Sequence, residues 1–275
     1  MKLKTADNVL PFTKMSGTGN DFIVINNMQG TYAIDWSSFA AHYCTRRTSV
    51  GADGVLIIEG STEADFNYRI FNADGSEAEM CGNGARCAAL FAFQHKVAGR
   101  HMWFNTLAGI IEAKVNTHDI SIRMTDPHNL EKDILLDIGT QQHRVDFINT
   151  GVPHTVIFTE DLSTISIIEL GRAIRMHEHF SPAGTNVNFV QIMEDGHIRV
   201  RTYERGVEAE TLACGTGAVA SALISNCVRH VPGPPVHVHM PGGELSIDFL
   251  LDHESFSDVW LRGSVDIVYT GNISL

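Results

Sequence analysis

The pattern of apolar and polar positions along the chain predicts mainly short β-strands. Apolar side chains, many of them β-branched or aromatic, gather in short runs bounded by Gly, Asn, Asp and Pro. The clearest runs are residues 22–25, 55–58, 68–71, 120–124, 154–158 and 197–203. We therefore expect β-sheet to dominate the fold.

Helical patterns are few, and they fall into two kinds. Residues 36–46 and 165–176 have mixed faces, with Asp35 as the expected N-cap of the first and Ser163 or Thr164 of the second. Residues 84–93 and 217–225 are apolar almost all round, which is typical of helices inside a core. The expected fold class is α/β (α+β), with two pseudo-symmetric domains that each wrap a mostly antiparallel, curved sheet around one central helix.

Internal similarity supports a duplication. The ten residues from Cys81 match the ten from Cys214 at six positions, 133 residues apart, and residues 75–79 resemble residues 206–210. Chance likeness of two alanine-rich helices does not predict both shared motifs. We expect a boundary near residues 125–127, where a strand pattern gives way to a polar stretch with a proline. A ligand site between two such halves is a natural expectation.

Composition narrows the possible functions. The 275-residue chain carries a net charge of −12 with scattered basic residues, which disfavours nucleic acid as a partner. It has no apolar run long enough for a membrane span, and residues 1–14 lack the apolar core of a signal peptide, so we expect a cytoplasmic protein. His237 and His239 would share one strand face, but no further ligand accompanies them, and we expect no metal.

Cys81 and Cys214 are the candidate catalytic residues. Each stands directly before Gly-x-Gly and a predicted helix, where unpaired N–H groups and the helix dipole favour the thiolate. The same glycine turns can hold a carboxylate. Inversion of a stereocentre needs a base on one face of a carbon and an acid on the other, and two pseudo-equivalent thiols can serve as both. Backbone donors would stabilise the charge that develops on the substrate carboxylate.

The other cysteines are expected to be inert. Cys87 lies inside an apolar helix, and Cys44 and Cys227 lack the glycine context, so buried packing explains all three. The same explanation is open for Cys81 and Cys214, but packing does not account for the repeated motif. We also expect oxidation to join Cys81 and Cys214 if their sulfurs flank one carbon. No pyridoxal or dinucleotide motif is apparent.

Longer motifs resemble one known family. Residues 14–22, 72–77, 80–87, 204–206 and 211–217 are similar to those of diaminopimelate epimerase, and the likeness runs through nearly the whole chain. The resemblance implies conversion of LL-diaminopimelate to the meso form, without cofactor or metal, for lysine and peptidoglycan precursor synthesis. It implies domains at residues 1–125 and 126–264, with residues 265–275 returning to the first, and a possible homodimer.

The resemblance also implies roles for individual residues. Cys214 would take the proton from the L-centre and Cys81 would donate to the opposite face, with His154 and Glu204 tuning the site. The positions that match substrate-binding residues of the family are Asn20, Asn72, Gly82, Asn83, Asn186, Glu204, Arg205, Gly215 and Thr216.

Each polar residue in this set also has an ordinary structural explanation. The three asparagines outside the cysteine motifs could be turn residues, Glu204 and Arg205 a solvated pair, and His154 a strand histidine. Gly54 and Val152 stand where some family members carry Gln and Asn. This loss of polar side chains prompts the hypothesis of relaxed specificity, including action on a shorter acidic amino acid.

Two alternative functions stay open. The chain could be another two-cysteine racemase, of the proline or hydroxyproline type, or a related isomerase with one cysteine replaced. It could also be a non-catalytic protein that binds an amino acid between two lobes, although the second cysteine would then have no purpose.

Overall fold

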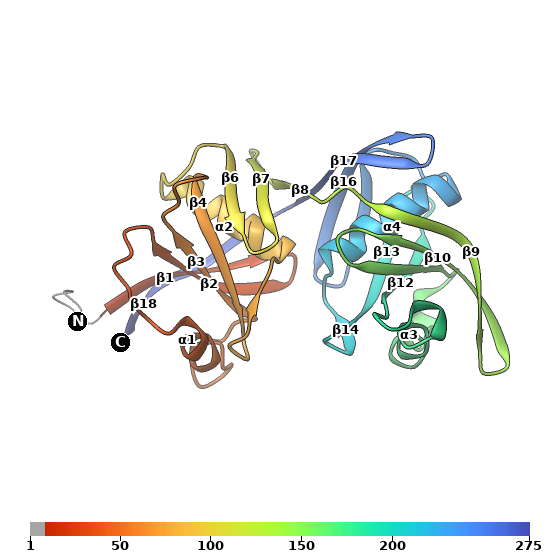
Figure 1. Cartoon of the computed structure of the whole chain (residues 1–275), viewed down its shortest axis with the longest axis horizontal. Helices are drawn as coiled ribbons and strands as arrows, with labels where there is room; N and C mark the ends of the chain where they lie inside the picture. Colours follow the sequence, from red (N-terminus) through yellow and green to blue (C-terminus); the bar gives the residue numbers. More distant parts are fainter. Residues whose placement is uncertain (1–8) are drawn as a thin grey trace. The chain divides into compact units, whose positions relative to one another are not determined.

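A computed structural model describes residues 9–275, and these form two compact units. The first unit extends to Ile122 and includes Gly263–Leu275, and the second is Arg123–Arg262. Residues 1–8 lie outside the described residues. They include the first eight residues of the expected N-terminal domain and more than half of residues 1–14, where no signal peptide is expected. The C-terminal strand belongs to the first unit, where it pairs with the first strand of the chain (Figure 1).

The first unit is a mixed sheet that is mostly antiparallel. Its strands pair in the order β18–β1–β2–β3–β4–β6–β7–β8, with β5 on β4, and only β2/β3 and β4/β6 are parallel. The elements are β1 (Val9–Gly17), β2 (Asn20–Asn27), α1 (Trp36–Tyr43), β3 (Gly54–Glu59), β4 (Phe66–Asn72), β5 (Glu77–Ala78), α2 (Gly82–Gln94), β6 (His101–Thr106), β7 (Gly109–Val115), β8 (Ile120–Arg123) and β18 (Asp266–Ser274).

The second unit repeats this topology. Its strands pair in the order β9–β10–β11–β12–β13–β15–β16, with β14 on β13, and only β11/β12 and β13/β15 are parallel. The elements are β9 (His128–Ile138), β10 (Gln141–Asn149), β11 (Pro153–Phe158), α3 (Ile167–Arg175), β12 (Asn186–Ile192), β13 (Ile198–Glu204), β14 (Ala209–Thr211), α4 (Gly215–Arg229), β15 (Val236–Met240), β16 (Gly243–Asp252) and β17 (Ser255–Gly263).

The strand pairings match across the two units element by element. Phe22 pairs with Gly54 between β2 and β3, and His154 pairs with Asn186 at the same place between β11 and β12. Helices α1 and α3 follow equivalent strands, and so do α2 and α4. The predicted two pseudo-symmetric domains, each with a sheet around one central helix, are therefore confirmed.

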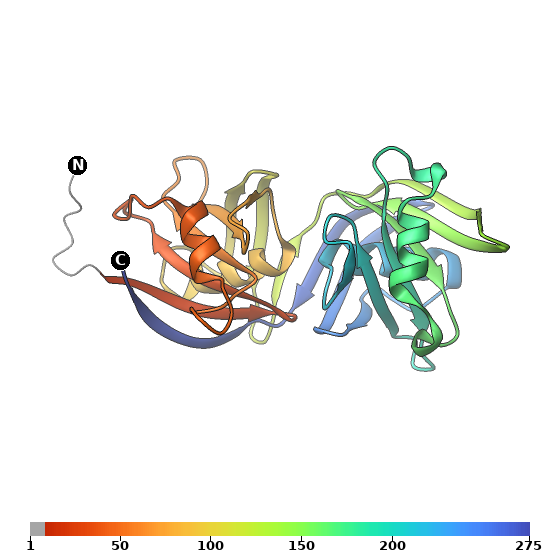
Figure 2. The ribbon, with the colours of Figure 1, turned by 90° about the horizontal axis from the view of Figure 1, so that it is seen from below.

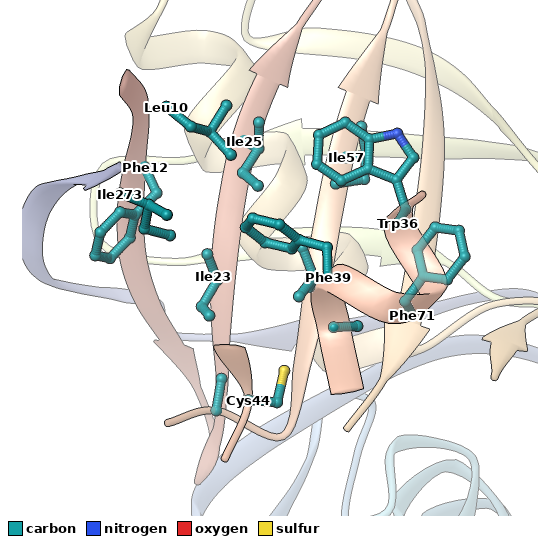
Figure 3. Close-up of a cluster of buried hydrophobic side chains, with 13 residues drawn as sticks. Leu10, Phe12, Ile23, Ile25, Trp36, Phe39, Cys44, Ile57, Phe71 and Ile273 are labelled. Carbon is teal, nitrogen blue, oxygen red and sulfur yellow. The ribbon is translucent and has the colours of Figure 1, made fainter. Parts of the chain in front are cut away.

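Helices cover both faces of the central strands, which explains why these strands are apolar throughout. In the first unit, Trp36 and Phe39 of α1 pack on Ile23, Ile25 and Ile57 (Figure 3). The intervening side chains of β2 and β3 face α2, which contacts β1, β2, β3, β4 and β7. Helix α3 packs in the same way over the strands of the second unit (Figure 2).

One predicted helix start is wrong. Ser163 and Thr164 do not cap α3, since they belong to a short 3-10 turn, Leu162–Thr164, whose own cap is Asp161. Helix α3 begins after Ser166. Asp35 does cap α1, and its carboxylate accepts hydrogen bonds from the backbone of Ser37 and Ser38.

Candidate active site

Cys81 begins α2. It is the N-cap residue, with extended backbone angles (φ −136°, ψ 121°), and its carbonyl accepts the N–H of Ala85 at 2.7 Å. The side chain is half-buried. Gly82 and Asn83 form the first turn, whose N–H groups have no acceptor within the helix. Cys81 therefore stands at the positive end of the α2 dipole.

Cys214 has the same place on α4. It is the N-cap (φ −124°, ψ 108°), and its carbonyl accepts the N–H of Ala218 at 2.9 Å. Its side chain is 6% exposed, and its Sγ lies 3.5 Å from Oγ1 of Thr216. A Cβ added to Gly217 would lie 3.2 Å from this sulfur, so the thiol is directed along the first turn of the helix. Both cysteines thus begin helices, as the sequence pattern predicts.

The second glycine of each motif is required by close packing. A Cβ on Gly84 would lie 2.6 Å from the hydroxyl of Tyr68, and one on Gly217 would lie 2.4 Å from Oδ1 of Asn188. Real Cβ atoms essentially never approach other atoms this closely. The Gly-x-Gly sequence therefore lets each helix start sit directly against the sheet.

Two of the predicted binding residues in the first unit are joined by a hydrogen bond. Asn83 Nδ2 donates to Asn20 Oδ1 at 2.6 Å, and Asn20 Nδ2 donates to Asp53 Oδ2 at 3.0 Å. Asn72 is exposed at the end of β4 and donates to Ser76 Oγ at 3.0 Å. The strand pairing places Asn72 opposite Gly54, which in turn pairs with Phe22, two residues after Asn20.

Arg86 extends this polar chain, and its role was missed from the sequence. It is fully buried, and its Nη2 donates to Asn83 Oδ1 at 2.9 Å and to Thr18 Oγ1 at 2.6 Å. The available signal was a single charge in an otherwise apolar helix. Its partner Thr18 is 68 residues away, so the contact could not be read from local pattern.

His154 is buried in the second unit. Its Nδ1 lies 3.1 Å from Nδ2 of Asn188, which also donates to the carbonyl of Thr155 at 3.0 Å. Burial, and then the positive charge of Arg205, lower the pKa of His154 to about 3, so the imidazole is neutral near pH 7. Asn188 lies against Gly217 and so connects the histidine to the start of α4. Asn188 was not predicted, because it lies within an apolar strand pattern.

Asn186 begins β12, Glu204 ends β13 and Arg205 follows it, whereas Gly215 and Thr216 begin α4. Asn186 donates to the carbonyl of Pro153 at 3.1 Å and accepts the N–H of Arg205 at 2.8 Å, so its amide holds the backbone together. The guanidinium of Arg205 donates to the carbonyl of Ala183 at 3.1 Å. Burial raises the pKa of the Glu204 carboxyl. Thr216 accepts a hydrogen bond from Thr150 at its carbonyl, 3.1 Å away.

The other three cysteines have the environment of structural thiols. Burial raises the pKa of Cys44 and of Cys227 to about 11, and that of Cys87 to about 12. Each therefore stays protonated near pH 7 and is a poor base. This agrees with their predicted lack of reactivity.

His237 and His239 do lie on β15, and His239 Nε2 lies 3.1 Å from Nδ1 of His197. Within residues 9–275, no group of three or more His, Cys, Asp or Glu side chains is arranged to hold a metal ion. None of the helices in that part of the chain has the length and apolar character needed to cross a membrane.

Gly54 stands where some family members carry Gln. An added Cβ there would lie 2.6 Å from the carbonyl oxygen of Phe71, so close packing against β4 explains why this position holds a glycine.

Comparisons with known proteins identify one family. The family model described as diaminopimelate epimerase matches residues 12–130 and 147–268. A diaminopimelate epimerase of Aquifex aeolicus is 45% identical over 96% of this chain and 98% of its own length.

Solved structures show the same fold at much lower identity. A phenazine biosynthesis protein of the PhzF family from Bacillus anthracis has a TM-score of 0.75 at 14% identity, and covers 97% of this chain and 99% of its own. A hydroxyproline epimerase from Agrobacterium vitis has a TM-score of 0.67 at 16% identity, and covers 100% and 94%. At these identities the likeness concerns the fold alone.

Proposed function

The chain belongs to the diaminopimelate epimerase family, and we propose that it is an isomerase that interconverts LL- and meso-diaminopimelate in lysine synthesis. The observation that carries the proposal is the repeated helix start. Cys81 and Cys214 are the N-cap residues of α2 and α4, the two helices that follow equivalent strands in the repeated topology.

We propose a two-base reaction for these thiols. The thiolate of one cysteine removes the proton from the substrate α-carbon and becomes a thiol. The thiol of the other cysteine delivers its proton to the opposite face of the carbanion and becomes a thiolate. The substrate leaves with the same atoms and inverted configuration, and the protein is left with its charge on the other sulfur.

The first turns of α2 and α4 support the difficult step of this reaction. Negative charge builds on the α-carboxylate as the proton leaves, and positioned N–H donors stabilise such charge. Gly82 with Asn83, and Gly215 with Thr216, supply backbone N–H groups at helix N-termini. A fixed polar surrounding of this kind needs no rearrangement when the charge develops.

The second unit adds a candidate contact for the remainder of the substrate. Arg205 is tethered through its backbone to Asn186 and through one guanidinium nitrogen to Ala183. This tether leaves the rest of its planar donor set for a bidentate bond to a carboxylate. Diaminopimelate carries a carboxylate at each end, so one can bind at a helix start and the other at Arg205.

Solvent deuterium tests the proposal. In D2O, the protein should place deuterium on the α-carbon of diaminopimelate and invert it, and it should leave proline unlabelled. Exchange into proline but not diaminopimelate would instead favour a racemase of the proline type. No exchange into either amino acid would leave only a binding role and would refute the proposal.

A further inference from the structure

Asn188 is a fully buried asparagine of β12 whose amide orientation is fixed by its neighbours. Its Nδ2 donates to the carbonyl of Thr155 at 3.0 Å, and its Oδ1 accepts the hydroxyl of Thr202 at 2.9 Å. A carbonyl oxygen can only accept, so the atom that faces Thr155 must be the nitrogen. Turning the amide over would bring two oxygens together. The partners of this side chain therefore settle where its nitrogen and its oxygen lie.

The same amide nitrogen also faces the ring of His154. Nδ2 of Asn188 lies 3.1 Å from Nδ1 of the imidazole. An amide nitrogen only donates, so Nδ1 must be the acceptor. Burial, and then the positive charge of Arg205, lower the pKa of His154 to about 3, so the ring is neutral near pH 7. A neutral imidazole carries one hydrogen, and with Nδ1 as the acceptor that hydrogen is on Nε2.

The Nε2–H of His154 is a buried donor near the start of α4. Asn188, which bonds the ring, also lies against Gly217 in the first turn of that helix. Within residues 9–275, Nε2 has no hydrogen-bond acceptor. A buried N–H without an acceptor is costly, and an acceptor bound at this place would relieve the cost. A carboxylate is a suitable acceptor, because the first turn of α4 supplies further N–H groups for it.

The matching positions of the first unit are apolar. The strand pairings place Leu56 at the position of Asn188 and Phe22 at the position of His154. Both of these side chains are buried. The shared fold therefore packs these positions without any polar group. The hydrogen-bonded pair of Asn188 and His154 belongs to one repeat, and packing alone does not explain it.

We propose that Asn188 is a positioning residue that holds His154 as the Nε2–H tautomer, so that the ring acts as a hydrogen-bond donor and not as a proton acceptor. Nδ1 is engaged by Asn188 and Nε2 already carries a hydrogen, so neither nitrogen can take a proton from a substrate. This inference deepens the proposed function, and its catalytic part rests on that function. Proton removal is left to the thiolates, and the Nε2–H is a donor for the carboxylate that the start of α4 is proposed to bind.

Nitrogen NMR tests the tautomer without substrate. The full chain is labelled with ¹⁵N-histidine, and the signals of His154 are identified as those that His154→Phe removes. Near pH 7, Nε2 should show a bonded hydrogen and Nδ1 should show the chemical shift of a ring nitrogen without one. A hydrogen on Nδ1 in the unaltered chain would overturn the proposal, and this measurement does not depend on the folding of any variant of Asn188.

Substitutions test whether Asn188 sets the tautomer. Asn188→Asp replaces the donor with an acceptor and should place a hydrogen on Nδ1 of His154. Asn188→Leu, which installs the side chain of the matching position in the first repeat, should let the Nδ1–H form appear beside the Nε2–H form. Gln191→Leu removes an amide from the same strand, where it donates to the carbonyl of Glu160 at 2.8 Å, and should change neither nitrogen. In either folded variant of Asn188, an Nδ1 without hydrogen would refute the role of Asn188.

The kinetics of diaminopimelate inversion separate a donor from a base. Asn188→Asp should lower kcat roughly 10- to 100-fold, the range that loss of one hydrogen bond to a charged group gives. KM should change much less, because charge grows on the carboxylate only as the proton leaves. A ring that acted as a base would gain a free Nε2 in this variant, so an unchanged or higher kcat would contradict the donor role. Deuterium exchange in the unaltered chain decides the proposed function independently, since the NMR measurement needs no substrate.

Discussion

At the scale of single residues, the two repeats keep the cysteines and differ around them. His154 occupies the position that Phe22 holds in the first repeat, and Val219 occupies the position of Arg86. A reaction that removes a proton from one face of a carbon and adds one to the other face needs an acid/base group on each side. The proposed reaction depends on the two cysteines, and it does not require the residues around them to match.

The buried neutral state of His154 predicts an acid-sensitive fold. Its pKa is about 3 in the folded chain and near 6.5 when unfolded, so between these values the unfolded chain binds more protons. This contribution to stability is complete above pH 6.5 and is lost as the pH falls toward 3. The free energy of unfolding should fall by up to about 1.4 kcal/mol per pH unit in that window.

Urea unfolding at several pH values measures this slope. His154→Phe, which installs the side chain of the matching position in the first repeat, should flatten the slope between pH 6 and 4. His118→Phe changes an exposed histidine and should keep it. Equal slopes for His154→Phe and the unaltered chain would show that this imidazole is not buried in its neutral form.

Site residues could be predicted from the sequence where a motif is repeated. They could not be predicted where the contact joins segments that are far apart in the chain. Cys81 and Cys214 could be identified because the same motif occurs twice and each motif precedes a helix. The contact of Arg86 with Thr18 and that of Asn188 with Gly217 depend on tertiary packing. The sequence around Arg86 and around Asn188 has no local pattern that predicts these partners.

At the scale of elements, the helix starts are positioned by glycines that pack on side chains of the sheet. Gly217 meets Asn188 of β12, and Gly84 meets Tyr68 of β4. Apolar helices 84–93 and 217–225 were predictable from composition, and α2 and α4 confirm them with longer bounds. The start of α3 was not, because Asp161 forms its own short turn and competes with the predicted caps.

Alanine at these glycines should displace the thiols. Gly217→Ala would place a Cβ 2.4 Å from Asn188 Oδ1, and Gly84→Ala would place one 2.6 Å from the Tyr68 hydroxyl. Each change should lower the free energy of unfolding by about 1–3 kcal/mol, since overpacking forces neighbouring groups to move. The rate of diaminopimelate inversion should also fall in variants that stay folded, because the cysteine directly precedes the turn that moves.

Chemical unfolding and the diaminopimelate assay together measure both effects. Gly99→Ala is the control, since its added Cβ meets only the carbonyl of His101, at 3.8 Å. That variant should stay within about 0.5 kcal/mol of the unaltered chain. If Gly217→Ala or Gly84→Ala matched Gly99→Ala in stability and activity, close packing would not be what positions the helix starts.

At the scale of the whole molecule, duplication places one N-cap cysteine in each unit, and the proposed reaction uses both as its acid and base. The equivalent strand pairings and helix positions show that the same supersecondary plan was used twice. Because inversion exchanges the roles of acid and base, a pseudo-symmetric protein can catalyse both directions with one set of residues. The sequence predicted this plan from its two cysteine motifs, while strand order and register required the structure.

The central claim is that both sulfurs act on one α-carbon, and single substitutions test it most directly. Cys81→Ser and Cys214→Ser are assayed separately in D2O for inversion of diaminopimelate and for deuterium at its α-carbon. Each should lower the rate of inversion by on the order of 10²–10⁴-fold, since each removes one of the two proton-transfer groups. One-sided exchange can survive in either variant. Inversion at the unaltered rate in either variant would contradict the two-thiol account.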